Sequence, residues 1–289
     1  MPPIPYENLG ALERAIDERD FLLGAIQAPV AIPPAAKHDM MGFRRNFQGQ
    51  TPACGPHAAS HLKQLLDDNG TAPPHYTPDF TWIELKDPNS GVYDNHPLED
   101  GTDMRSLLAS MRKKGMDDFD PLGNDVTLSL AQYSDPSRVT PDMIADAVKK
   151  LIQSYAFGNT DYDSLCQHYY QNGGVIILGK VDEGFWGTTE VTLKNPKWGH
   201  FFTMFGYDEP GIWIVDSAEP DPTKAFKHIA KEFIQPQFIV ESGTVVNIPL
   251  SVHLALRSGF IEIAQQILKD MEAVLHLDQQ LVPKVATPN

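Results

Sequence analysis

Three residues that lie far apart in the chain, Cys54, His200 and Asp216, have the types needed for nucleophilic catalysis. Cys54 stands where a polar loop rich in Pro and Gly meets an apolar helical pattern. The unpaired N–H groups and the dipole of a helix N-terminus stabilise a thiolate, which is the reactive form of cysteine. Because most free cysteines are small buried core residues, Cys54 needs a base before catalysis is favoured.

The second half of the chain supplies that base. His200 opens one predicted strand and Asp216 closes the next, with a turn sequence between the two runs. An antiparallel hairpin of this kind can bring the two residues side by side. We expect Asp216 to bind Nδ1–H of His200, which would leave Nε2 free to take a proton from Cys54.

Two further features lie close to Cys54 in the sequence. Gln48 carries an uncharged amide that could stabilise an oxyanion together with the Cys54 backbone N–H. His57 and His61 are rival bases, but neither has an acidic partner at a matching spacing. We interpret both histidines as solvent-facing or as lining a substrate site.

Helical patterns dominate the first half of the chain and strand patterns the second. The residues that follow Cys54 predict a helix that stops at Asn69-Gly70. About five or six runs of β-branched and aromatic residues follow residue 174, separated by Gly, Pro and Asp. We therefore predict an α+β fold with a helical N-terminal lobe, an antiparallel sheet or half-barrel as the C-terminal lobe, and a cleft between the lobes.

Composition restricts the partners. The formal net charge of −15 in 289 residues disfavours nucleic acid and anionic lipid surfaces, and no apolar run is long enough to cross a membrane. The N-terminal sequence has no secretory leader pattern, so we expect a cytoplasmic protein, or a virion protein if its source is viral.

Metal and cofactor sites are not expected. The two cysteines are too few for a disulfide framework or a cysteine-based zinc site, and Cys166 is predicted to be a core residue. The acidic residues from Asp94 to Asp103 lack the spacing of an EF-hand loop and predict a solvated loop. We assign no cofactor and no metal.

The chain is predicted to have three parts. Residues 1–37 form an N-terminal arm with a Pro-rich, extended stretch that could act as a propeptide-like strap. Residues 38–250 form the main domain, and residues 251–289 a C-terminal helical extension. The apolar face of that extension could pack on the domain, which we favour, or form a homodimer interface.

The motifs resemble those of papain-like cysteine peptidases of the C1 family, of the bacterial or viral type without disulfides. Gln48, Gly49 and Cys54 match the family's Gln, Gly and nucleophilic Cys, and Gly199-His200 matches the Gly-His that precedes a strand. Asp216-Ser217 matches the family's Asn-Ser, sixteen residues after the His. The resemblance covers roughly residues 14 to 250, at the level of motifs.

Four positions depart from the family pattern. Thr51 and Gly55 replace a disulfide cysteine and a tryptophan, Ala218 replaces a tryptophan that shields the His-Asn pair, and Asp216 replaces the Asn. An Asp in that place also resembles transglutaminases and acyltransferases, which share the Cys-His-Asp order.

The resemblance implies a cysteine endopeptidase that acts on a polypeptide substrate through a Cys-His-Asp triad and a covalent acyl-enzyme. One alternative is acyl transfer to an amine, as in a transglutaminase, or an amidase. The other is an inactive papain-like scaffold that serves binding or particle assembly.

Overall fold

The computed structural model describes residues 9–13, 27–68 and 73–246. These residues belong to the compact unit that ends at Val246. The predicted C-terminal extension at 251–289, with its homodimer contact, lies outside the described residues, as do parts of the N-terminal arm.

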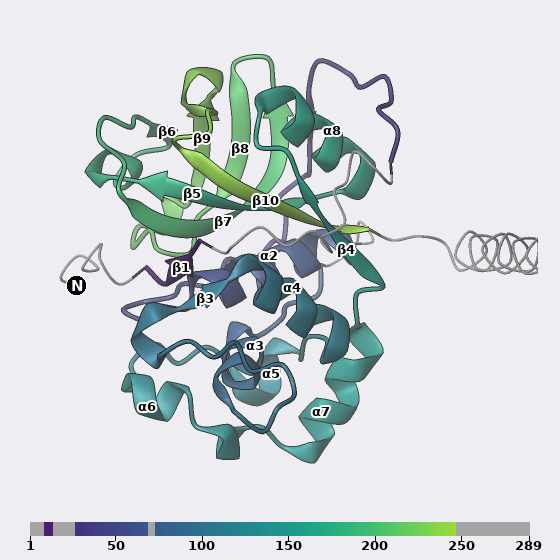
Figure 1. Ribbon diagram of the computed structural model, residues 1–289, viewed down its shortest axis with the longest axis vertical. Helices are drawn as coiled ribbons and strands as arrows, with labels where there is room; N and C mark the ends of the chain where they lie inside the picture. The colour runs from purple at the N-terminus through teal and green to yellow at the C-terminus, as the bar shows by residue number, and fades with distance from the viewer. Residues whose placement is uncertain (1–8, 14–26, 69–72, 247–289) are drawn as a thin grey trace, which may run out of the picture. The chain divides into compact units, whose positions relative to one another are not determined.

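Helices make up the first lobe of this unit, in the lower half of Figure 1. They are α2 (Cys54–Leu66), α3 (Pro78–Lys86), α4 (Met104–Lys113), α5 (Phe119–Leu122), α6 (Leu130–Tyr133) and α7 (Pro141–Ala147).

Side chains at the helix starts explain several of these boundaries. Thr77 and Thr140 each precede a Pro at the first helical position and accept a hydrogen bond from the backbone of their own helix. Asp103 caps α4 without a following Pro, by accepting from the Ser106 N–H at 3.0 Å. These caps satisfy N–H groups that have no partner within the helix, so each helix begins at a defined residue.

An eight-stranded sheet forms the second lobe. Its main path runs in the order β4, β10, β5, β7, β8, β9, β6, with β2 paired to β7. Its pairs are antiparallel except for β6 with β9. The strands are β2 (Ala36–Lys37), β4 (Ser154–Gly158), β5 (Val175–Val181), β6 (Glu190–Val191), β7 (Trp198–Asp208), β8 (Gly211–Val215), β9 (Phe226–Ala230) and β10 (Ile239–Val246).

The α+β prediction with an antiparallel second lobe is therefore confirmed. One helix, α8 (Tyr162–Asn172), packs against this sheet (Figure 1). Helix α7 ends at Ala147, and a 3-10 turn, η4 (Val148–Lys150), leads from it toward β4.

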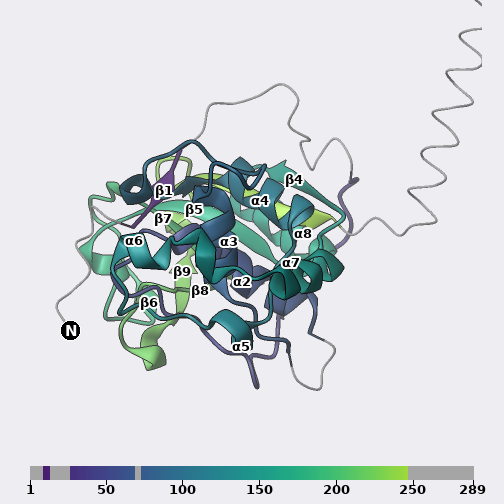
Figure 2. The same cartoon turned by 90° about the horizontal axis from the view of Figure 1, so that it is seen from below.

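Helix α2 lies where the two lobes meet: Figure 1 shows it between the sheet and the other helices, and in the view from below in Figure 2 it lies near the middle of the unit. It packs against β7 and β5 on one side and against α3 and α4 on the other. Every residue from Cys54 to Leu65 is buried, including the polar ones. A helix that separates two layers has no solvent face, so its polar side chains must find partners inside the protein.

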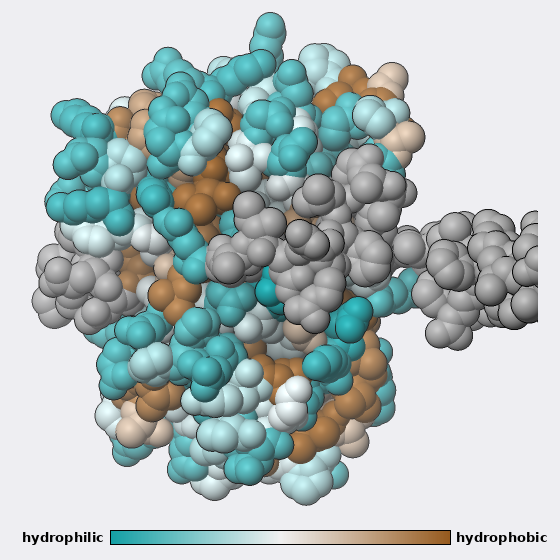
Figure 3. Space-filling model, in the orientation of Figure 1, coloured by the Kyte–Doolittle hydropathy of each residue, from teal (hydrophilic) through white to brown (hydrophobic). Residues whose placement is uncertain are grey.

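The visible outer surface of both lobes is largely hydrophilic in Figure 3. Ile144, Val148 and Leu151 are exceptions, exposed by 40 to 45% of their area, in α7 and just after it. None of the helices in the described ranges is both long and apolar enough to cross a membrane.

A buried ion pair organises the loop between α3 and α4. Lys86 Nζ lies 3.0 Å from Asp94 Oδ2, and both side chains are almost inaccessible to solvent. The same ammonium donates to the carbonyls of His96, Pro97 and Gly101. The prediction of a solvated loop is therefore wrong at Asp94, because the cation on α3 draws this acid inside. No group of metal-binding side chains occurs among the described residues.

Asp94→Ala should lower the free energy of unfolding by about 3 kcal/mol or more, because it leaves the Lys86 ammonium buried without its counter-charge. Urea unfolding followed by circular dichroism measures the loss. Lys149→Ala is the matched control, since its pair with Asp146 is exposed and is worth less than about 1 kcal/mol. Equal effects of the two substitutions would contradict the importance of the buried pair.

Candidate active site

Cys54 is the first residue of α2, as its sequence context predicts. The N-cap residue Ala53 provides no side-chain hydrogen bond, and the first turn contains no acidic residue. The field of the helix N-terminus therefore acts on the thiol without a nearby carboxylate from the same turn to oppose it.

The Cys54 thiol is completely buried in this conformation. Loss of solvent raises its pKa to about 12, although hydrogen bonds from the backbone of Phe201 and Gly55 partly counter that effect. The thiol is therefore protonated at neutral pH for as long as it stays covered.

His200 and Asp216 are brought together by the pairing of β7 with β8. The two strands are antiparallel, and Thr203 lies opposite Val215, so the start of β7 meets the residue that follows β8. Nε2 of His200 lies 2.8 Å from Oδ1 of Asp216, and both side chains are fully buried. The predicted proximity of the two residues is confirmed.

The orientation of the imidazole differs from the prediction. Asp216 binds Nε2, not Nδ1, and Nδ1 is buried without a hydrogen-bond partner among the described residues. The sequence places the two residues side by side but does not determine the side-chain rotamer that selects one ring nitrogen. Nδ1 is therefore the nitrogen that remains available for proton transfer.

Asp216 is held as a carboxylate despite its burial. Burial opposes its ionisation, but the hydrogen bond and charge of His200 and the charge of Lys227 outweigh it and keep the pKa of Asp216 below its usual value. The backbone N–H of Ala218 also donates to Oδ1 at 2.8 Å. A proton donor on His200 thus faces a fixed negative charge.

An aromatic cover over His200 comes from a part of the chain that sequence reasoning missed. Phe185 and Trp186 follow β5, and their ring centroids lie 5.7 and 6.4 Å from that of His200. Phe185 is fully buried. His200 therefore has aromatic neighbours although Ala218 replaces the tryptophan expected beside it. In the sequence, the only sign of this aromatic cover is the Phe185-Trp186 pair that follows an apolar strand pattern.

Steric crowding explains why position 55 carries Gly in place of the tryptophan of the family pattern. A Cβ atom on Gly55 would lie 2.7 Å from Cγ2 of Thr102 and 3.3 Å from the Phe201 ring. The side chains around the start of α2 therefore fill the space that a larger residue at position 55 would need.

Gln48 lies on the loop before α2 and is fully buried. Its Nε2 donates to the Thr51 carbonyl at 3.0 Å, and its Oε1 accepts from Ser217 Oγ at 2.8 Å. Its backbone N–H also donates to the Ser217 carbonyl at 3.0 Å. These bonds join the loop before Cys54 to the residue after Asp216 and orient the amide, whose second N–H can serve an oxyanion.

The interpretation of His57 and His61 as solvent-facing is wrong, because both are fully buried. His57 Nδ1 is bonded to the Ala53 carbonyl at 2.8 Å, and His61 Nε2 accepts from the Asn46 N–H at 3.0 Å. Burial lowers the pKa of His57 to about 4 and that of His61 well below its usual value. They are neutral internal groups that secure α2.

Cys166 is a buried residue, as predicted.

A short extended segment of the N-terminal arm, residues 9–13, passes beside Pro52 and Gly199, which lie next to the candidate site, and we call it the strap. Within it, β1 (Ala11–Leu12) pairs in parallel with β3 (Thr102–Asp103), and the Gly10 carbonyl accepts from the Thr102 N–H at 2.9 Å. Gly10 has a φ of 84°. A Cβ there would overlap the Pro52 carbonyl oxygen, and one on Gly199 would lie 2.6 Å from the Ala11 oxygen. The strap therefore runs between the residues that precede Cys54 and His200, where a side chain has no room.

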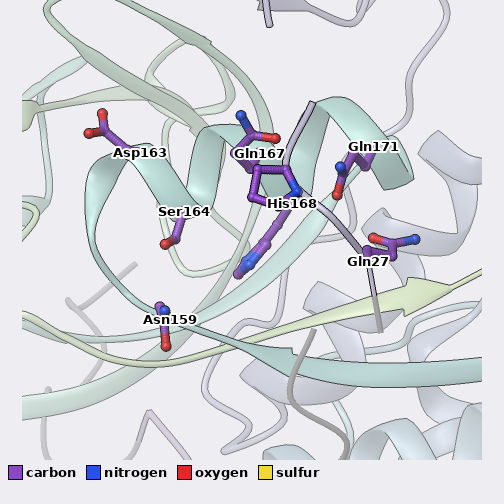
Figure 4. Close-up of a pocket in the computed structure, with 8 residues that line it drawn as sticks. Gln27, Asn159, Asp163, Ser164, Gln167, His168 and Gln171 are labelled. Carbon is purple, nitrogen blue, oxygen red and sulfur yellow. The ribbon is translucent and has the colours of Figure 1, made fainter. Parts of the chain in front are cut away.

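The arm is fastened again further along, on helix α8. Gln167 accepts from the Val30 N–H at 3.1 Å and donates to the Val30 carbonyl at 2.7 Å. Gln171 donates to the Ala28 carbonyl at 2.8 Å. Figure 4 shows both amides beside a pocket that Gln27 and His168 also line, and whose volume is about 240 Å³. Neither Cys54 nor His200 lines it, so this pocket belongs to the attachment of the arm.

Comparison with solved structures identifies the architecture. Xylellain, a cysteine protease from Xylella fastidiosa, superposes with a TM-score of 0.70 at 16% identity, over 86% of this chain and 99% of that one. The chain has a papain-like fold. A digestive procathepsin L 3 of Tenebrio molitor also shares it, with a TM-score of 0.60 at 12% identity, over 84% of this chain and 77% of that one.

A third structure with the papain-like fold contains the cysteine protease and lectin-like domains of Cwp84 from Clostridium difficile. It gives a TM-score of 0.59 at 12% identity, over 76% of this chain and 53% of that one. No protein-family model and no curated protein matches the sequence. The similarity therefore lies in the fold, with little sequence identity behind it.

Gly10→Val should uncover Cys54. Valine is strained at a positive φ by about 1 to 2 kcal/mol and would also clash with the Pro52 carbonyl, so the strap should leave and iodoacetamide should alkylate Cys54 about tenfold faster or more. Peptide mass spectrometry measures the rate, with Cys166 as the internal reference.

Gly91→Val is the control. Gly91 has a φ of 77° but open space around its Cβ position, so the same backbone strain acts away from the strap. An unchanged rate for Gly10→Val, or an equal increase for both variants, would show that the strap does not limit access to Cys54.

Proposed function

We propose that the protein is a cysteine peptidase that hydrolyses peptide bonds in polypeptides. The observation that carries this proposal is the buried hydrogen bond between Nε2 of His200 and Asp216, which leaves Nδ1 as the free nitrogen. It occurs in a papain-like fold that the chain shares with several cysteine proteases, and Cys54 begins the central helix of that fold.

The proposed reaction begins when Nδ1 of His200 takes the proton of the Cys54 thiol. The thiolate attacks the amide carbonyl, and the resulting oxyanion is stabilised by the Gln48 amide and the Cys54 backbone N–H. The imidazolium then protonates the leaving amine, which departs and leaves a thioester on Cys54. His200 next removes a proton from water, whose attack releases the carboxylic acid and restores the thiol.

Asp216 has a defined part in this sequence. Its carboxylate accepts the Nε2–H of His200, so the neutral ring carries its proton on Nε2 and presents the lone pair of Nδ1. The same negative charge stabilises the imidazolium while Cys54 is a thiolate.

The structure represents the resting state of the proposed enzyme. A polypeptide substrate has to displace the strap before its carbonyl can reach Cys54, since the strap fills the space between Pro52 and Gly199. Displacement would return water to the thiol and remove the main cause of its raised pKa. Access of substrate and activation of the nucleophile are then one event.

Cys54→Ala and His200→Ala should each reduce hydrolysis of a peptide substrate by a factor on the order of 10³ or more, because one removes the nucleophile and the other the general base. Cleavage of a fluorogenic peptide mixture and of unfolded casein measures this. Cys166→Ala is the control and should retain activity. Undiminished hydrolysis by Cys54→Ala would refute the proposal.

Product analysis distinguishes hydrolysis from acyl transfer. With a primary amine present, a peptidase of this kind should give mainly free carboxylic acid, whereas a transferase gives amine-capped product. An alkylatable Cys54 without either product would instead favour an inactive scaffold.

A further inference from the structure

A buried lysine lies behind the His200–Asp216 pair and has no part in the reaction described above. Lys227 belongs to β9, and its side chain is fully buried. Its Nζ lies 2.8 Å from Oε2 of Glu219 and 3.8 Å from Oδ2 of Asp216, and it donates to the Thr188 carbonyl at 3.1 Å. An internal ammonium needs such partners to replace water.

The position of Lys227 follows from the register of the sheet. Lys227 lies opposite Ile214 on β8, two residues before Asp216. The end of β8 that leads into Asp216 therefore lies beside the strand that carries the lysine. Phe185 connects the two groups a second time, since Lys227 Nζ lies 5.3 Å from its ring centroid and His200 packs against the same ring.

Glu219 determines how strongly Lys227 acts on Asp216. Its Oε2 accepts from Lys227 and from the Gly187 N–H, both at 2.8 Å, and its Oε1 accepts from the Asp221 N–H at 3.2 Å. Three donors therefore surround the Glu219 carboxyl group. It holds the ammonium closer to itself than to Asp216 and weakens the positive field at Asp216.

Arg45 completes the set of charges around Asp216. It donates to the backbone carbonyl of Glu219, and its charge also acts on Asp216 and Asp221. The positive groups that act on Asp216 are thus Lys227 and Arg45, while Glu219 and Asp221 contribute negative charge.

We propose that Lys227 and Glu219 are positioning residues that set, through Asp216, the pH range in which Cys54 and His200 form a reactive pair. This inference rests on the proposed function. The negative charge of Asp216 favours protonation of the neighbouring Cys54 and His200. The Lys227 ammonium, 3.8 Å from Asp216, offsets part of that charge. Glu219 limits that offset, so the two residues act in opposite directions.

The opposite signs provide the test. Lys227→Met keeps the side-chain volume but removes a positive charge, which makes proton binding easier at every nearby group. Glu219→Gln removes a negative charge and has the reverse effect. Lys227→Met should move both inflections of the pH profile to higher pH, by about one unit or more, and Glu219→Gln should move both to lower pH. The double variant should lie between them.

The profile is measured in two ways on the full chain, as the rate of Cys54 alkylation by iodoacetamide and as kcat/KM for a peptide. Lys231→Met is the control, since this lysine is exposed directly after β9 and pairs with Asp163 at 3.8 Å. Its profile should match that of the unmodified protein. Thermal unfolding of each variant records any loss of stability separately.

Both variants loosen the loop that carries Gly187 and Thr188, so a purely structural role predicts lower stability with unshifted inflections, or shifts in the same direction. Either result overturns the proposal. If Lys227→Met does not fold, an absent or upward shift in Glu219→Gln has the same meaning. Shifted inflections without hydrolysis count against the proposed function, whereas hydrolysis with unshifted inflections counts against the role of Lys227.

Discussion

The contact between helix α2 and strand β7 is the constraint on which the rest of the structure depends. Cys54 begins the helix and His200 lies near the start of the strand, so their relation is determined by how the two elements pack. Thr203 donates to the Ala58 carbonyl at 2.7 Å and fixes β7 against the second turn of α2. The buried apolar residues Leu62, Phe201 and Ile176 fill the same interface. A shift of either element would separate the proposed nucleophile from its base.

Because this interface lies inside the molecule, every polar group near it needs an internal partner. His57 and His61 bond to backbone groups, Gln48 bonds across to Ser217, and Asp216 is surrounded by His200, Ala218 and Lys227. The same low-dielectric surroundings that make unpaired charges costly also make each paired charge effective at a distance of a few ångströms. The helix positions the thiol, and the buried charges of the sheet lobe adjust the proton equilibria around it.

Local sequence patterns predicted the parts of this arrangement that depend on chain connectivity. The polar-to-apolar change at Cys54 marked the start of α2, and the turn between two apolar runs implied the hairpin that joins His200 to Asp216. Features that depend on packing between distant segments could not be read in this way. The side-chain rotamer that directs Nε2 of His200 to Asp216 is one such feature, and the aromatic cover from Phe185 and Trp186 is another. Lys227 stands in a strand pattern typical of a surface lysine, and only the neighbouring loops make it internal.

The attachment of the N-terminal arm has a consequence for the concentration dependence of the closed state. The strap and the site belong to one chain, and the arm is held to the sheet lobe at residues 27–30 and through β2. The strap therefore meets its place beside Pro52 and Gly199 at an effective concentration on the order of millimolar, however dilute the protein is. Dilution cannot release the strap. A competing ligand displaces it only when the ratio of its concentration to its Kd exceeds the ratio of the effective concentration of the strap to the Kd of the untethered strap. Loss of the covalent link between the strap and residue 27 would convert the closed state into an ordinary bimolecular equilibrium.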